Sequence, residues 1–370
     1  MRVTLEKSAF LKALNHVQSV VERRNTIPIL SNVMVEAKGG EVKLTATDLD
    51  IEIVESVAAD VAQDGAATVP AHMLYDIVRK LPDGAQLELN QAGDKGRISI
   101  IAGRSRFALQ ALPPEDFPDL SSGAFGNTFS LPASALRFLI ERTRFAISTE
   151  ETRYYLNGIY FHEVASGNLL RAVATDGHRL AQSQMELPQG ASGMPGIIVP
   201  RKTVLELVKL FEGEDGDVEV AMSAAKIRLT FGRLVLTSKL IDGTFPDYER
   251  VIPRNNDKIL EADTKQFAEA VDRVSTISFE KSRAVKLNIS EGRLGLVVNN
   301  PDSGSAEEEL AVSYDREAIE IGFNSRYLLD VAAQVKAENM RFEFNDAGSP
   351  TVVRDPKDEH SLFVLMPMRV

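Results

Sequence analysis

Apolar residues recur at helical spacing in three well-separated stretches of the chain. In each stretch they follow the spacing i, i+4, i+7, i+11, which gathers them into one stripe along a helix. These stripes are Phe10, Leu14, Val17 and Val21; Leu136, Ile140, Thr143 and Ile147; and Phe267, Val271, Val274 and Ser278. A shorter stripe with spacing i, i+3, i+4, i+7 follows each of them: Leu74, Ile77, Val78 and Leu81; Val204, Leu207, Val208 and Phe211; and Leu328, Val331, Ala332 and Val335. The patterns predict helices over 7–24, 71–80, 134–148, 201–212, 264–281 and 325–338.

The segments between these helices are rich in Val, Ile and Leu and are separated by turn residues, which predicts strands. Two short motifs recur among them. ATD ends at Asp48 and again at Asp176, and FPD begins at Phe117 and again at Phe245, each pair 128 positions apart. The last part of the chain lacks both motifs but keeps the order of elements. We therefore predict three copies of one α+β domain, each with two helices packed on antiparallel sheets, over 1–126, 127–254 and 255–370, with the SSGAFGN segment at 121–127 as a linker.

Charge is unevenly distributed. The whole chain has a net charge of −11, yet the four helices predicted in the first two repeats are basic. Their basic residues are Lys7, Lys12, Arg23, Arg24, Arg79, Lys80, Arg137, Arg142, Arg144, Arg201, Lys202 and Lys209, against the acids Glu22, Asp76, Glu141, Glu206 and Glu212. A single basic helix is often only a solvated face. Four helices that agree in sign favour a surface that faces a polyanion.

Composition narrows the possible functions. The chain has no cysteine, which excludes thiol nucleophiles, disulfides and cysteine-ligated zinc. The N-terminus MRVTLEKSAF has no apolar signal region, and no uncharged apolar run is long enough to span a bilayer. We expect a cytoplasmic protein without cofactor or metal.

The stretch VATDGHRLA at 173–181 invites a catalytic interpretation. Asp176 and His178 could form an acid–base pair or bind a metal. However, the ATD motif recurs with Leu49 in place of Gly177 and Asp50 in place of His178. A recurring Asp favours a turn, since its carboxylate readily accepts hydrogen bonds from nearby backbone N–H groups. We therefore predict no catalytic residue. A sequence-specific DNA-binding regulator is a third possibility, but no reader motif such as helix-turn-helix stands out.

Longer motifs carry a family resemblance. RYYLNG at 153–158, ATDGHRLA at 174–181, VPRKTVLELVK at 199–209, SKLIDGTFPDYERVIP at 238–253 and the terminal VLMPMRV resemble the bacterial DNA polymerase III beta subunits, the sliding clamps. The resemblance covers the whole chain. It implies three tandem clamp domains, and a head-to-tail homodimer that closes a six-domain ring around duplex DNA. Such a clamp slides along DNA of any sequence and tethers the replicative polymerase without catalysing a reaction.

The resemblance also implies a DNA-binding set. Arg24, Tyr154 and Tyr155 match family positions that touch DNA, and the basic helix residues Arg137, Arg201 and Lys202 complete the expected set. Arginine can pair with phosphate, and tyrosines can stack or hydrogen-bond. The alternative for the tyrosines is that at least one is a buried core aromatic. The loop at 149–151 departs from the family pattern, because Glu150 and Glu151 place two acids where DNA should approach.

The ring requires a seam between two copies. Arg104, Arg106 and Phe107 are expected on an edge strand of the first domain, with both arginines on one face. Thr276, Ile277 and the acidic run Glu307, Glu308 and Glu309 are expected on the facing edge of the third domain. Opposite charges would set the head-to-tail pairing, and Phe107 with Ile277 would add apolar contact. Taken alone, both charged segments would more often be solvated surface.

Finally, the resemblance implies a hydrophobic groove between the second and third domains. It accepts a short partner motif in which Gln precedes leucines and an aromatic residue. Partners of this kind are the polymerase III alpha subunit, other DNA polymerases, the clamp loader, mismatch repair proteins and DNA ligase. The matching positions are Arg153, Leu156, Thr175, Gly177, His178, Arg179, Leu180, Pro246, Arg250, Val251, Asn324, Tyr327, Val364, Met366, Pro367, Met368 and Arg369. Leu, Val, Pro and the polarizable Met suit an adaptable groove, with the polar side chains at its margin.

Overall fold

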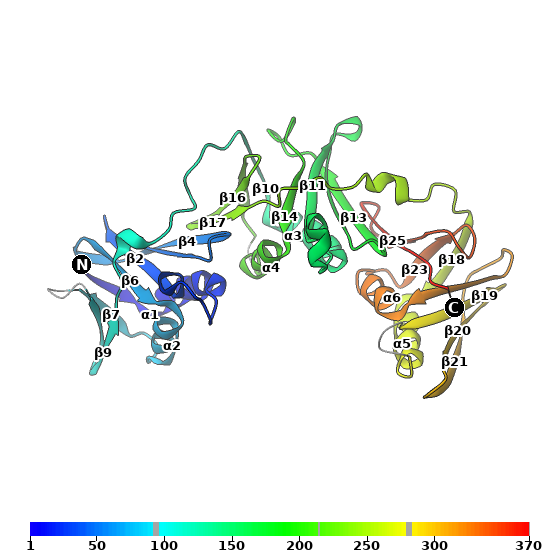
Figure 1. Cartoon of the computed structure of the whole chain (residues 1–370), viewed down its shortest axis with the longest axis horizontal. Helices are drawn as coiled ribbons and strands as arrows, with labels where there is room; N and C mark the ends of the chain where they lie inside the picture. The colour runs from blue at the N-terminus through cyan, green and yellow to red at the C-terminus, as the bar shows by residue number, and fades with distance from the viewer. Residues whose placement is uncertain (92–95, 214, 279–282, 370) are drawn as a thin grey trace. The chain divides into compact units, whose positions relative to one another are not determined.

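The computed structural model describes residues 1–91, 96–213, 215–278 and 283–369. These residues form two compact units (Figure 1). The first unit contains 1–136, 188–195 and 205–240, and the second contains 137–187, 196–204 and 241–370. Each unit has a large antiparallel sheet and a small one.

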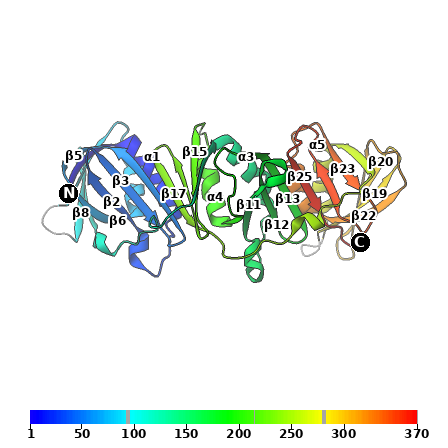
Figure 2. The ribbon, with the colours of Figure 1, turned by 90° about the horizontal axis from the view of Figure 1, so that it is seen from above.

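The large sheet of the first unit joins strands from the first and second thirds of the chain in the order β10-β15-β16-β17-β4-β3-β2-β6. The strands are β2 (Asn32–Lys38), β3 (Glu41–Thr47), β4 (Ile51–Ala58), β6 (Gly65–Pro70), β10 (Asn127–Pro132), β15 (Asp217–Met222), β16 (Lys226–Phe231) and β17 (Leu234–Lys239). Strands β4 and β17 pair antiparallel, with Glu52 opposite Thr237. Strands 180 positions apart thus share one continuous sheet, and Figure 2 shows β2, β3 and β6 side by side in it.

Two helices cover one face of this sheet. Helix α1 (Lys7–Val17) packs on β3 and β4, and α2 (Ala71–Lys80) packs beside α1 (Figure 1). The carboxylate of Glu6 caps α1 by accepting a hydrogen bond from the Ala9 N–H at 3.0 Å. Phe10, Leu14 and Val17 are fully buried, so the apolar stripe seen in the sequence is the packing face of the helix.

The small sheet of the first unit has the order β5-β1-β7-β8-β9. Its strands are β1 (Arg2–Glu6), β5 (Asp60–Gln63), β7 (Gln86–Asn90), β8 (Arg97–Ala102) and β9 (Ser105–Gln110). Strand β9 lies at one edge of this sheet.

The second unit repeats this plan. Its large sheet has the order β14-β11-β12-β13-β25-β24-β23-β18, and its small sheet the order β21-β20-β19-β22. The strands are β11 (Gly158–Val164), β12 (Leu169–Thr175), β13 (Arg179–Glu186), β14 (Ile197–Pro200), β18 (Lys258–Asp263), β19 (Ala284–Ser290), β20 (Arg293–Asn300), β21 (Gly304–Ala311), β22 (Ile319–Asn324), β23 (Asn339–Phe344), β24 (Thr351–Arg354) and β25 (Ser361–Leu365). Strands β13 and β25 pair as β4 and β17 do in the first unit, with Leu180 opposite Val364.

Helices α5 (Thr264–Ser275) and α6 (Ser325–Ala332) of the second unit pack on each other, and α5 also packs on β20 and β21. Helices α3 (Ala133–Thr143) and α4 (Arg201–Leu210) each have residues in both units. Short 3₁₀ helices complete the fold: Gln18–Val20, Pro28–Ser31, Pro114–Asp116, Arg144–Ala146, Glu151–Leu156, Ala165–Gly167 and Tyr248–Val251. No helix in the described ranges is long and apolar enough to cross a membrane.

The helix predicted over 71–80 matches α2 at both ends, whereas the other predicted helices are right in place but end too late. Helix α1 ends at Val17, where the predicted helix ran to residue 24, and α3 ends at Thr143 instead of residue 148. Both continue as one 3₁₀ turn, which keeps Val20, Val21, Ala146 and Ile147 buried. Helix α5 ends at Ser275, and residues 279–281 of its predicted extent lie outside the described ranges. The apolar pattern in the sequence runs past the end of each of these α-helices because the residues of the following 3₁₀ turn are buried against the same core.

The repeated ATD motif forms the same turn twice. In the first unit Asp48 Oδ1 accepts from the N–H groups of Asp50 (2.9 Å) and Ile51 (2.7 Å). In the second unit Asp176 Oδ1 accepts from the corresponding residues His178 (2.9 Å) and Arg179 (3.0 Å). The central residue has positive φ in both turns, 78° at Leu49 and 88° at Gly177. The interpretation of Asp176 as a turn residue is therefore confirmed.

Candidate functional site

A groove of about 270 Å³ opens on the second unit beside the ATD turn. It lies between the ends of β12, β13 and β25 and the segment 245–251, which begins with the FPD motif. Its lining residues are Arg153, Tyr155, Leu156, Thr175, Gly177, Arg179, Leu180, Pro246, Asp247, Tyr248, Val251, Val364 and Met366.

The floor of the groove is apolar. Leu156, Val173, Leu180 and Val364 belong to one buried cluster together with Phe245 and Tyr248. Burying each of these side chains stabilises the unit by about 1.5–3 kcal/mol, so the floor is a fixed part of the core. At the rim, Val251 and Met366 remain 46% and 38% exposed. A rigid apolar floor with exposed apolar rim residues suits an apolar ligand, because binding buries surface that water now covers.

The polar end of the groove is formed by Arg153, whose Nη2 lies 2.7 Å from a Glu150 carboxylate oxygen. A Cβ placed on Gly177 would come within 2.5 Å of Arg153 Nη1, and φ at this glycine is 88°. Gly177 is thus required both by its left-handed backbone and by the close approach of the guanidinium. The acidic loop at 149–151 thus supplies an ion-pair partner to a groove residue.

Tyr248 forms one wall and is held by two side chains. Its hydroxyl lies 2.9 Å from His162 Nε2 and accepts a hydrogen bond from Arg171 Nη1 at 2.9 Å. Arg171 also pairs with Glu249 at 2.9 Å. Burial raises the pKa of Tyr248, so the phenol stays neutral, and burial lowers the pKa of His162. This cluster fixes the segment that closes the groove.

The lowered pKa of His162 predicts a pH dependence of stability. Because the folded pKa lies below the ordinary value of 6.5, the stabilising contribution is present above that value and lost as pH falls. We expect the free energy of unfolding of the second unit, measured by urea titration, to fall between pH 7.5 and 5.5 by up to about 1 kcal/mol from this residue. His162→Gln should flatten this dependence, whereas the exposed His360→Gln should leave it unchanged. An identical pH profile in His162→Gln would contradict the assignment.

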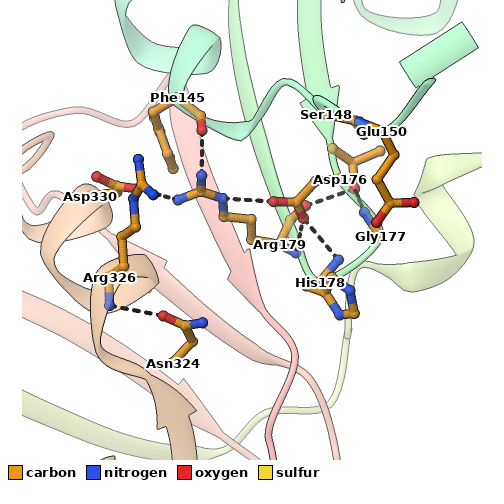
Figure 3. Close-up of polar contacts among 11 residues, drawn as sticks. Phe145, Ser148, Glu150, Asp176, Gly177, His178, Arg179, Asn324, Arg326 and Asp330 are labelled. Carbon is orange, nitrogen blue, oxygen red and sulfur yellow. Dashed lines mark hydrogen bonds and ion pairs between the residues drawn. The ribbon is translucent and has the colours of Figure 1, made fainter. Parts of the chain in front are cut away.

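Arg179 joins three parts of the second unit (Figure 3). Its guanidinium pairs with Asp176 (3.1 Å) and Asp330 (2.5 Å) and donates to the Phe145 carbonyl (2.6 Å). The same group lies over the rings of Tyr327 and Phe145, at 4.3 and 5.2 Å from their centroids. Arg179 is only 8% exposed. Its guanidinium is therefore largely engaged within the protein, while its side chain also lines the groove as expected.

The other residues expected in the groove divide into two sets. Arg153, Leu156, Thr175, Gly177, Leu180, Pro246, Val251, Val364 and Met366 line it together with Arg179. His178, Arg250, Asn324, Tyr327, Pro367, Met368 and Arg369 lie outside its lining. Within this second set, His178 is exposed and lies 6.5 Å from the Tyr327 ring, and Asn324 caps α6 through the Arg326 N–H at 3.0 Å.

Three groove residues were not foreseen as such. Asp247 and Tyr248 follow Pro246 directly, and Tyr155 was assigned to DNA although it also packs against the buried cluster. The recurrence of FPD could have pointed to the segment with Asp247 and Tyr248, because a motif that recurs together with the ATD turn indicates a structural element common to both repeats. Tyr154 is 54% exposed and meets Tyr155 edge-on. The core alternative fails for Tyr154, whereas Tyr155 is partly buried against the apolar cluster.

The remaining DNA candidates lie on exposed or partly exposed positions. Arg24 is exposed and lies in the loop after the first helix, not at its end as expected. Arg201 and Lys202 are exposed at the start of α4, and Arg137 is partly exposed near Glu141 (4.0 Å). Two of the basic helix residues do not reach solvent: Lys7 pairs with Asp83, and Arg142 lies between Asp355 (3.6 Å) and Asp358 (3.3 Å). The basic bias of the helix surfaces is therefore smaller than the sequence count indicated.

The expected seam residues lie on two sheet edges. Strand β9 carries Arg106 and Phe107, but Arg104 lies in the preceding turn, so the prediction of both arginines on one strand is wrong. Phe107 lines a hollow of about 590 Å³ with residues of α2. On the second unit, Thr276 and Ile277 follow α5, and β21 forms the edge of the small sheet with Glu307 and Glu309 exposed. Glu308 pairs with Arg273 at 2.5 Å, which lowers the pKa of its carboxyl.

The described residues contain no group of three or more His, Asp or Glu side chains placed to hold a metal ion. Repeated α+β domains and an apolar groove with a polar end define a protein that binds other macromolecules through modular domains.

Comparison with known proteins identifies the kind of binding protein. Family models match most of the chain in three consecutive segments: the N-terminal domain of the DNA polymerase III beta subunit over residues 1–121, its central domain over 130–247 and its C-terminal domain over 249–369. A beta sliding clamp of Caulobacter vibrioides is 55% identical over 372 residues and covers both chains fully. That of Escherichia coli K12 is 41% identical over 371 residues with full coverage. A crystal structure of a Bartonella birtlesii sliding clamp bound to griselimycin matches with a TM-score of 0.97 at 57% identity over 100% of both chains.

The chain belongs to the DNA polymerase III beta subunit family. It is built from three tandem clamp domains and functions as a DNA sliding clamp in replication, a processivity factor without catalytic activity of its own. The predictions of fold, family and non-catalytic function are confirmed.

Proposed function

We propose that two copies of this chain close head to tail into a six-domain ring that encircles duplex DNA, slides along it and tethers the replicative polymerase. The full-length match to sliding clamps carries this proposal. The domain boundaries proposed from the sequence are 1–126, 127–254 and 255–370, and the three family segments support three successive domains of similar length. We propose the cytoplasm as the place of action, where a bacterial chromosome is replicated.

A sliding clamp needs weak contacts with DNA of any sequence. Arg24, Arg201 and Lys202 are exposed cations that can contact phosphate. Two further cations lie on helices, Arg137 on α3 and Lys12 on α1. Tyr154, with more than half of its side chain exposed, can stack on a base or meet the sugar–phosphate backbone. Such contacts carry no sequence information and weaken with salt, which permits movement along the duplex.

The topological nature of binding gives the decisive test. Loaded onto nicked circular DNA by a clamp loader, the protein should remain bound after dilution in high salt. It should dissociate once the circle is cut, because a ring can slide off a free end while a conventional DNA-binding protein cannot distinguish the two substrates. Equal retention on circular and linear DNA would overturn the proposal.

We propose that the groove binds the partner motif, in which leucines and an aromatic residue follow a glutamine. The floor around Leu180 and Val364 suits the apolar residues, and Arg153 suits the polar head. His178, Asn324 and Tyr327 would contact the parts of the motif that extend beyond the hollow, as would Arg250, Pro367, Met368 and Arg369. Candidate carriers are the polymerase III alpha subunit, other polymerases, the clamp loader, mismatch repair proteins and ligase.

The proposed seam pairs the β9 edge of one copy with the β21 edge of the other. Arg104 and Arg106 then face Glu307 and Glu309, and Phe107 meets Ile277. Both strands lie at an edge of their sheet, which favours continuation of the sheet across the interface.

Reversal of the two seam arginines is expected to weaken the dimer. Arg104→Glu with Arg106→Glu would bring four like charges together, and we expect the dimer dissociation constant to rise about tenfold or more. Mass photometry over a dilution series measures this. Arg97→Glu, an exposed arginine at the start of the neighbouring strand β8, serves as the control. Unchanged dimer mass in the double variant would contradict the proposed seam.

A further inference from the structure

The first unit has a cavity of its own, unrelated to the DNA candidates. It measures about 630 Å³ and lies on the face of the large sheet opposite α1, under the segment 117–121. Glu52, Thr45 and Thr237 contribute polar side chains from β4, β3 and β17, and Met34, Val54 and Val235 contribute apolar ones. All of these residues belong to the same compact unit.

The backbone around this cavity corresponds to the backbone around the groove of the second unit. Each lies beside an ATD turn, against a paired strand from the following repeat, and under the segment that begins with FPD. The register of pairing makes Glu52 the counterpart of Leu180, and Thr237 the counterpart of Val364. The offset of 128 positions that relates the two ATD motifs also relates Glu52 to Leu180.

Different side chains at corresponding positions change which ligand each of the two sites can bind. The apolar floor of the groove, with Leu180 and Val364, is replaced by a carboxyl and a hydroxyl. Tyr248, which fills the corresponding space in the second unit together with His162, has Leu120 as its counterpart. The side chain of Leu120 is smaller than that of Tyr248, and the site in the first unit is the larger one, at about 630 Å³ against about 270 Å³.

Glu52 is a buried acid with an incomplete set of partners. It is 2% exposed, and within the described ranges its carboxyl accepts one hydrogen bond, from the Leu120 N–H to Oε2 at 3.0 Å. Burial raises the pKa of this carboxyl. A buried carboxyl can accept several hydrogen bonds, so Glu52 can take a further N–H donor from a ligand in the cavity.

The opposite side of the cavity offers a donor. Arg228 lines it, with its guanidinium donating to the Ser121 carbonyl and lying 4.3 Å from the centroid of the Phe125 ring. Its Nε atom is buried and has no hydrogen-bond partner. At the rim, Lys43 and Glu36 neutralise each other at 2.6 Å. A ligand that both donates and accepts, and carries no net charge, matches this arrangement.

We propose that this cavity binds the carboxamide side chain of a glutamine or asparagine in an extended peptide of a protein partner. The amide N–H donates to Glu52, the amide carbonyl faces Arg228, and the aliphatic stem packs on Val54 and Val235. We expect an extended peptide because the corresponding site in the second unit is an open groove across the ends of the corresponding strands.

Capped amino acids test the chemistry directly. N-acetyl-glutamine methylamide is titrated into the full-length protein carrying ¹³C-labelled methionine methyl groups, with Met34 in the cavity wall as the reporter. We expect a saturable shift of the Met34 resonance in the millimolar range. The capped glutamate and capped methionine analogues keep the two backbone N–H groups but lack the side-chain N–H donor, and they should bind about tenfold more weakly.

Substitution at Glu52 gives the second test. Glu52→Leu installs the residue present in the groove and should weaken capped glutamine about tenfold, whereas Glu36→Gln at the rim should not change its affinity. Equal affinity for the three capped residues, unchanged affinity in Glu52→Leu, or no saturable shift of Met34 would each overturn the proposal. Should Glu52→Leu fail to fold, the comparison of the three ligands on the unaltered protein still decides.

Discussion

Arg179→Ala is expected to destabilise the second unit by about 3 kcal/mol, because removing one partner from a buried ion pair leaves its acids uncompensated. Asp176 would lose a side-chain partner, Asp330 would lose its 2.5 Å contact, and the Phe145 carbonyl would lose its donor. The stacking on Tyr327 would also be lost. Urea unfolding followed by intrinsic tyrosine fluorescence measures the effect as a fall in midpoint.

Two further variants test whether the loss of stability is specific to the buried guanidinium of Arg179. Arg179→Lys should recover little of the loss, because an ammonium cannot make three divergent contacts and stack on an aromatic ring. Arg250→Ala removes an arginine that also pairs with an aspartate three residues away, Asp247 at 2.6 Å, but whose side chain is 83% exposed. It should cost less than about 0.5 kcal/mol. Equal midpoints for Arg179→Ala and Arg250→Ala would refute the structural role of Arg179.

Truncation of the groove rim is expected to cause the largest loss of partner binding without loss of fold. Met366 and Val251 are exposed and lie above a floor that stays intact in their absence. We expect Met366→Ala with Val251→Ala to weaken a peptide of the form Gln-Leu-Ser-Leu-Phe by about thirtyfold, since two apolar contacts of this kind are worth about 2 kcal/mol together. Fluorescence anisotropy with a labelled peptide measures the dissociation constant.

Leu205→Ala is the matched control for this loss. Leu205 is as exposed as Met366, at 38%, lies on α4 and is not part of the groove lining. Its substitution should leave peptide affinity within a factor of about two. Unfolding midpoints of all variants should agree with that of the unaltered protein. A rim variant that binds the peptide as tightly as the Leu205 variant would show that the peptide docks elsewhere.

The comparison of the two cavities shows how internal repetition diverges. The ATD turns use the same hydrogen bonds at Asp48 and Asp176, and both central residues adopt positive φ. Leu49 bears the strain of that conformation, while Gly177 adopts it without a side chain and thereby leaves room for Arg153. One backbone frame thus supports an apolar groove in one unit and a polar cavity in the other.

Periodicity alone determined much of this fold. The stripe Phe10, Leu14 and Val17 is the buried face of α1, and Phe267, Val271 and Val274 play the same part in α5. The repeats of ATD and FPD identified recurring elements, and the absence of cysteine excluded thiol chemistry. These features could be predicted because they depend on residues that are close in sequence or that repeat at a fixed interval.

Tertiary structure decided which polar residues are available to partners. Arg142 and Arg179 look like solvent-facing cations in the sequence, yet both are buried: Arg142 lies between the buried Asp355 and Asp358, and Arg179 pairs with the distant, partly exposed Asp330. Glu52 looks like an ordinary strand residue and becomes a buried acid only because the segment ending at Leu120 folds over it. Charge and burial at these positions depend on neighbours more than 60 residues away in the chain, so no local pattern could report them.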